Sequence, residues 1–96
     1  MTGAAFDEVI HAPNRLQICS MLAAVDAMEF SVVREALDVS DSVLSKHVRV
    51  LQDAQYASVT KVRRRAWLAL TPEGRQALAG HIAALRRIVE QAEADR

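Results

Sequence analysis

The stretch SDSVLSKHVRVLQDAQYASVTKVRRRAWLALTPEGRQAL, residues 40–78, contains the change of sequence pattern that decides the fold. In its first part, residues 41–54, the apolar side chains of Leu44, Val48 and Leu51 recur at the spacing of one helix face. The pattern predicts a helix that is buried along this face and exposed along the opposite one.

The period changes after this helix. Residues 56–70 alternate or cluster β-branched and large apolar side chains around the basic run KVRRR, which predicts a two-stranded hairpin. Thr71 can cap a following helix, and Pro72 suits its first position because the N–H that proline lacks would have no helical partner there. We expect this last helix to cover residues 72–94.

The N-terminal part of the chain predicts three further helices and a short extended link. Ser31 is the expected cap of the third helix, whose inward-facing residues are expected to be Val32, Val33, Ala36 and Leu37. The expected segments are helices at 5–11, 13–26 and 32–37, with a small strand or extended link at 27–31.

This order of elements predicts a mostly helical α+β fold, a winged helix-turn-helix in a single domain over residues 1–96, without an internal linker. Apolar residues make up 51% of the chain and aromatic ones only 4%. The core must therefore consist of aliphatic side chains, which favours helices.

The charges are unevenly distributed along the chain. Twelve basic and twelve acidic residues cancel, so net charge indicates neither nucleic acid nor a membrane surface as the partner. Residues 40–75 nevertheless hold seven basic against three acidic residues, and no acid occurs between Asp53 and Glu73. The distribution, rather than the total, points to a basic face.

The helix at 41–54 carries polar residues opposite its apolar face, namely Ser42, Ser45, Lys46 and Arg49. Short hydroxyls near the N-terminus and longer cations further along suit a helix whose first turns enter the DNA major groove. A solvated amphipathic face is the alternative, but such a face usually mixes both signs of charge and this one has no Glu.

The hairpin tip is the second candidate contact. Lys61, Arg63, Arg64 and Arg65 lie within five residues, where they repel one another unless a polyanion relieves them. We expect phosphate or minor-groove contacts, with a merely tolerated surface loop as the alternative.

The chain resembles small MarR/ArsR-like winged helix-turn-helix transcriptional regulators. The resemblance begins near NRLQICSML, includes LSKHVRVL and LTPEGR, and extends to about Leu85. It implies a dimeric DNA-binding regulator in which the polar stripe reads or positions DNA and Arg63, Arg64 and Arg65 flank the groove. Two departures are a short wing, which favours phosphate contact over deep insertion, and Gln55 at a position where such turns often have glycine.

The last helix carries an apolar stripe that can pack against another helix. Leu78, Ile82, Leu85 and Val89 recur at spacings of four and three residues, and with Phe6 they form the expected dimer interface. Packing against the chain's own first helix is the alternative. A two-fold dimer would present two recognition helices to a palindromic operator.

The sequence contains no pattern typical of metal binding, cofactor binding or catalysis. His11, His47 and His81 lack the spacing of a metal site, and no cofactor motif or catalytic constellation is present, so we expect no metal, no cofactor and no enzyme. His47 is expected to donate to a backbone carbonyl. Cys19, on an apolar helix face, is expected to be a buried hydrophobe, and Tyr56 and Trp67 to belong to the hairpin core.

The predicted function is therefore sequence-specific binding of double-stranded DNA by a homodimeric transcriptional regulator, a repressor, in the cytoplasm and without a membrane segment. A small-molecule effector is a possible partner that no residue identifies. The alternative is a winged-helix module that binds another protein through the same basic face, which the zero net charge keeps open.

Overall fold

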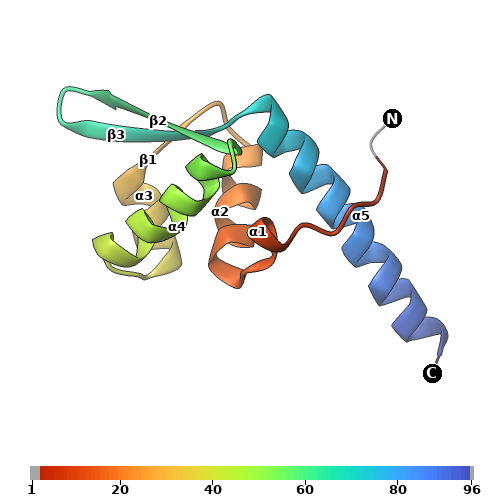
Figure 1. Cartoon of the computed structure of the whole chain (residues 1–96). Coiled ribbons are helices and arrows are strands. Elements are labelled where there is room, and N and C mark those ends of the chain that lie inside the picture. Colours follow the sequence, from red (N-terminus) through yellow and green to blue (C-terminus); the bar gives the residue numbers. More distant parts are fainter. Residues whose placement is uncertain (1–2, 96) are drawn as a thin grey trace.

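The computed structural model describes residues 3–95, and its elements follow the order of a winged helix (Figure 1). Four short helices and a small sheet form the globular part, from which the last helix projects. The elements are α1 (Glu8–His11), α2 (Pro13–Ala23), β1 (Met28–Glu29), α3 (Phe30–Leu37), α4 (Asp41–Asp53), β2 (Ala57–Val62), β3 (Arg65–Leu70) and α5 (Pro72–Ala94). The predicted fold class is confirmed.

One aliphatic core joins all the layers. Leu44, Val48 and Leu51 of α4 are buried on the face that the sequence predicts. They pack with buried residues of α1, α2, α3, the hairpin and the start of α5, and Cys19 is among them as expected. The members of this core are Ile10, Ile18, Cys19, Leu22, Val33, Leu44, Val48, Leu51, Ala57, Leu68, Leu70 and Leu78.

The sheet has three antiparallel strands in the order β1-β3-β2. The link expected before the third helix is thus a real strand, which pairs Met28 with Leu68 and Glu29 with Trp67. In the hairpin, Val59 opposes Leu68 on the core side, and Thr60 opposes Trp67 on the other side.

Three local expectations were wrong. Helix α1 starts at Glu8, because Asp7 is its cap and Ala5 donates its N–H to Gly80 O of α5. Helix α3 starts at Phe30, so Ser31 lies inside it, and Val32 (47% exposed) and Ala36 face solvent.

The prediction for Trp67 was also wrong. This residue is half-buried on the outer side of β3, whereas Tyr56 does pack against the core. The alternation of side chains along a strand explains the difference, since the neighbours Leu68 and Ala66 take the inner side.

A left-handed residue, a helix cap and an ion pair together stabilise the turn between α3 and α4. Asp38 ends α3 in the left-handed conformation (φ 54°), and Ser40 caps α4 by accepting from the Val43 N–H at 3.2 Å. The Arg34 guanidinium lies 3.2 Å from the Asp41 carboxylate, which joins the two helices.

The two ends of the hairpin meet at the start of α5. The Thr71 hydroxyl donates to Gln55 O at 2.6 Å and accepts from the Gly74 N–H at 2.9 Å, and the Thr71 N–H donates to Tyr56 O at 3.0 Å. Arg75 then donates to Ala23 O and Val25 O at the end of α2. The residues TPEGR therefore fix α5 against both the hairpin and α2.

Gly74 is the closest point of this junction. A Cβ atom at residue 74 would lie 2.0 Å from the Tyr56 carbonyl oxygen. Because the backbone fixes the position of both atoms, relieving this clash would require α5 or the base of the hairpin to shift. We predict that Gly74→Ala lowers the free energy of unfolding by about 3 kcal/mol, the upper part of the range for overpacking. Urea unfolding followed by circular dichroism measures this change.

Gly80→Ala on the same helix is the matched control, because its Cβ would lie 3.2 Å from the Gly3 carbonyl oxygen in the N-terminal segment. We expect a change within about 1 kcal/mol, since alanine also favours the helix. Equal effects of the two substitutions would contradict the role given to residue 74.

Candidate nucleic-acid interface

Helix α4 presents its predicted polar stripe to solvent. Ser42, Ser45, Lys46 and Arg49 are all exposed, on the side opposite Leu44 and Leu51. The stripe continues one turn further to Gln52, which is also exposed. Gln52 was not among the predicted residues, although its spacing from Ser45 and Arg49 could have revealed it.

The cations of this region are not paired with acids. Within residues 3–95 the ion pairs are Arg34 with Glu35, Arg34 with Asp41, and Arg65 with Glu29. Lys46, Arg49, Lys61, Arg63 and Arg64 take part in none of them. Asp41, at the start of α4, is itself paired with Arg34, so five cations on α4 and the hairpin are available to an anion.

A groove of about 300 Å³ brings part of the predicted set together between α4 and the hairpin. Ser45 of α4 and Lys61 of β2 both line it, so these two predicted residues are neighbours in space. Both apolar and polar side chains line it, and the lining residues are Phe30, Ser45, Val48, Gln52, Val59, Lys61, Ala66 and Leu68.

The tip of the hairpin is a two-residue turn built from arginines. Arg63 and Arg64 connect β2 to β3 and both have positive φ, 49° and 71°. A turn with positive φ at both central residues is of type I′ and is normally made by Asn-Gly or Asp-Gly. Side chains with a Cβ are destabilised in this conformation by roughly 1–2 kcal/mol each. Two arginines at this tip therefore lower stability, and they place two exposed charges at the end of the hairpin.

Arg65 differs from its neighbours. It begins β3, and its Nε lies 3.7 Å from a carboxylate oxygen of Glu29 on β1. Its side chain is still largely exposed, but the pair draws it toward the outer side of the sheet rather than toward α4. The three adjacent arginines thus divide into a tip of two and one residue held by an acid.

His47 attaches α4 to α2. The Arg15 guanidinium donates to His47 Nδ1 at 3.2 Å, and the Asn14 side chain lies 3.5 Å from Nε2, so the expected bond to a backbone carbonyl was wrong. Burial, with the positive charges of Arg15 and Lys46, lowers the pKa of His47 below its usual 6.5. His47 is therefore neutral at pH 7 and serves to hold α4 in place.

The residues expected at a dimer interface differ in how much surface they expose. Leu78 is only 4% exposed and belongs to the chain's own core, which leaves it almost no area for a second chain. Ile82 and Leu85 are half-buried, whereas Phe6 and Val89 are exposed by 46% and 54%. Ile88, which was not predicted, is as exposed as Val89.

Residues 3–95 hold neither a metal centre nor a membrane span. No group of three or more His, Cys, Asp or Glu side chains in this range is arranged to hold a metal ion. None of the helices described there is long and apolar enough to cross a membrane.

Comparison with known proteins agrees with this geometry. Residues 14–89 match the family model of the winged helix DNA-binding domain. The chain belongs to this family. No curated protein sequence matches this winged helix chain at a significant level.

Several solved structures similar to this winged helix domain are described as transcriptional regulators. A transcriptional regulator homologue from Pyrococcus horikoshii has a TM-score of 0.86 at 24% identity, over 90% of this chain and 89% of that one. A possible transcriptional regulator for arsenical resistance has a TM-score of 0.72 at 25% identity, over 93% of both chains. HlyU from Vibrio cholerae has a TM-score of 0.68 at 22% identity, over 75% of this chain and 78% of that one.

The strained tip gives a prediction about stability. Arg63→Asn combined with Arg64→Gly supplies the residues that a type I′ turn prefers, so the free energy of unfolding should rise by about 1–2 kcal/mol. Urea unfolding measures the gain. The control Arg63→Lys with Arg64→Lys keeps both the charge and the strain and should show no gain. A double variant no more stable than the natural chain would contradict the assignment of strain to the tip.

Proposed function

We propose that this winged helix domain is a sequence-specific regulator of transcription that binds double-stranded DNA as a cytoplasmic homodimer and represses by occupying a palindromic operator. The observation that carries the proposal is the set of five unpaired cations on α4 and the hairpin, with Arg63 and Arg64 kept in a turn they destabilise. A polyanion relieves the repulsion among these charges, and family membership makes DNA the polyanion.

The position of each side chain determines whether it can contact base edges or phosphates. Ser42, Ser45, Lys46 and Arg49 project from the exposed side of α4, which can enter a major groove and reach base edges. Arg63 and Arg64 lie at the end of a short hairpin, where phosphates are the accessible partners. Lys61, beside Ser45 in the groove, suits a phosphate at the edge of the same contact.

Dimerisation through α5 is supported by its exposed apolar residues. The helix has 23 residues, about 35 Å of length, and its C-terminal half carries Ile88 and Val89 largely in solvent. Ile82, Leu85 and Phe6 lie closer to the globular part and are partly exposed, and we include them in the same proposed surface. Burying such a stripe against a second copy removes it from water and sets two α4 helices at a fixed separation.

The arginine tip allows a test in which weaker binding cannot come from misfolding. The stabilised variant R63N/R64G should bind all duplexes more weakly. The slope of log affinity against log salt should become shallower by about 0.9 for each phosphate that the variant no longer neutralises. Fluorescence anisotropy with labelled duplexes from about 50 to 200 mM salt measures both effects. The control R63K/R64K should keep the slope, and an unchanged slope in R63N/R64G would refute the phosphate role.

Residues on α4 should behave differently from the tip. Lys46→Ala and Arg49→Ala should each lower the affinity for a duplex selected from a random pool by about 1–3 kcal/mol, with a smaller loss on random duplex. The ratio of the two affinities is the quantity to compare. Equal losses on both duplexes would show that these residues contact phosphates only. If the natural chain shows no salt-sensitive duplex binding at micromolar concentration, an acidic protein partner becomes the better explanation.

A further inference from the structure

The N-terminal segment is attached to α5 through a buried histidine. His81 is fully buried, the one polar side chain in residues 3–95 to be so. Residues 3–7 run across α5 in an extended path, with the Ala5 N–H donating to Gly80 O at 3.0 Å. Phe6 packs its ring against both His81 and His11, at centroid distances of 4.7 and 4.6 Å.

The hydrogen bonds at His81 fix the protons on the ring. The Asp7 backbone N–H donates to His81 Nδ1 at 2.9 Å, so this nitrogen has no proton. The other nitrogen, Nε2, then carries the proton of the neutral ring. It lies 3.1 Å from His11 Nδ1, to which it donates, and His11 Nδ1 must also be unprotonated.

A further proton has no place in this arrangement. Protonation of His81 sets an N–H against the Asp7 N–H. This event breaks the hydrogen bond between Asp7, at the end of the N-terminal segment, and α5. The same directions exclude Nε2 of His81 as a metal ligand, because a nitrogen that carries the proton has no free lone pair.

The charges around His81 do not make its protonation favourable. Burial, together with the neighbouring His11, lowers the pKa of His81, and the Asp7 carboxylate raises it by less. That carboxylate is already occupied, since it accepts from the Tyr56 hydroxyl at 2.5 Å and from the Ile10 N–H at 3.1 Å.

Three more titratable or charged groups adjoin the cluster. Hydrogen bonding to Asp7 and burial raise the pKa of Tyr56 to about 12, so the phenol stays protonated and keeps donating. Burial and Asp7 raise the pKa of Cys19 to about 11, so its thiol is neutral. The Arg15 guanidinium donates to Val9 O on the other side of α1.

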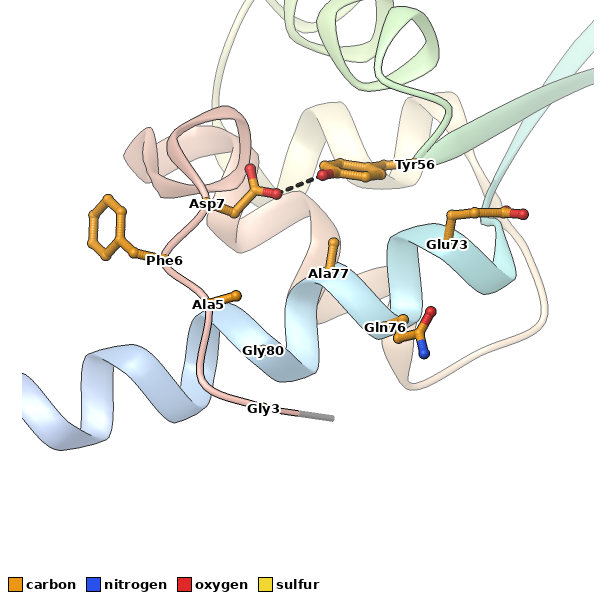
Figure 2. A pocket seen from close by; sticks show the side chains of 9 residues that line it. All are labelled: Gly3, Ala5, Phe6, Asp7, Tyr56, Glu73, Gln76, Ala77 and Gly80. Carbon is orange, nitrogen blue, oxygen red and sulfur yellow. Dashed lines mark hydrogen bonds between the residues drawn. The ribbon is translucent and has the colours of Figure 1, made fainter. Parts of the chain in front are cut away.

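We propose that His81, with His11 as its hydrogen-bond partner, forms a proton-operated latch, which holds residues 3–7 against α5 while the His81 ring is neutral and releases them when this ring binds a proton. The segment forms one wall of a hollow of about 420 Å³ between α5 and Tyr56 (Figure 2), so release removes that wall. Asp7, pointing at Tyr56 in this view, leaves with the segment.

The sign of the pH dependence follows from linkage. The pKa of His81 is lower in the folded state than its unfolded value of 6.5, so the attachment is complete above that pH and weakens as pH falls. Between about 6.5 and the lowered pKa of the folded state, the equilibrium constant for local opening rises as pH falls, by at most about tenfold per pH unit for a single proton.

Nuclear magnetic resonance on the free protein tests the latch without DNA. The ¹⁵N shifts of His81 at pH 7.5 should show a proton on Nε2 and none on Nδ1. Between pH 6.5 and 5 the hydrogen-exchange protection factors of the Ala5 and Asp7 amides should fall as pH falls, by no more than about tenfold per pH unit, while that of Leu68 in β3 stays high. A proton on Nδ1, or protection that does not change, would overturn the proposal.

Two variants identify the titrating group. In His81→Asn the side-chain oxygen can accept from the Asp7 N–H in place of Nδ1 but cannot take up a proton, so the pH dependence of protection should disappear. The matched control His47→Gln removes a histidine whose pKa is also lowered but which lies outside the latch, and it should keep the full dependence. The same acid response in His81→Asn as in the natural chain would overturn the latch.

Release of the latch should also affect DNA binding, an inference that rests on the proposed function. Tyr56 lies between α4 and β2, so loss of its bond to Asp7 loosens the joint that sets the hairpin beside α4. The preference for a selected over a random duplex should fall below pH 6.5 in the natural chain and stay constant in His81→Asn. If exchange shows release but this preference does not change, the latch stands and its coupling to DNA is refuted.

Discussion

The close approach of Gly74 to the Tyr56 carbonyl positions the hairpin, α2 and α5 relative to one another. The first turn of α5 reaches the backbone at the base of the hairpin because residue 74 has no side chain. Thr71 then bonds to both Gln55 and Tyr56, so the hairpin is closed at its base as well as at its tip. Arg75 caps the end of α2 from the same turn, and Tyr56 extends the junction to Asp7.

At the tip of the hairpin, the two arginines that supply positive charge also lower the stability of the turn. Asn-Gly at residues 63 and 64 would satisfy the turn, and the two arginines found there do not. Backbone strain of this kind persists where the surrounding structure enforces it and is concentrated at functional sites. The ladder between β2 and β3, which is continuous from the base of the hairpin to the pair of Val62 with Arg65, holds this turn in register.

The fold was largely predictable because its signals are local. The spacing of Leu44, Val48 and Leu51, the change to a strand period and the Thr-Pro start of α5 each depend on neighbours within one or two turns. The cations of α4 and the tip were found for the same reason. Gln55, noted as a departure from a glycine position, indeed has positive φ (65°).

What escaped prediction depends on contacts far apart in the sequence. The pairing of Arg65 with Glu29, the burial of Leu78 and the attachment of residue 7 to His81 all join segments that no periodicity relates. Trp67 failed for a simpler reason, because the strand pattern fixes alternation but leaves open which side faces the core.

A map of the DNA-binding surface by nuclear magnetic resonance tests the role of α4 and the hairpin. In a titration of the ¹⁵N-labelled protein with a short duplex at low salt, we predict shift changes at the amides of residues 42–49 and 61–64 that reverse when salt is raised. Shift changes confined to the C-terminal half of α5, or none in α4 and the hairpin, would contradict binding of DNA by this face.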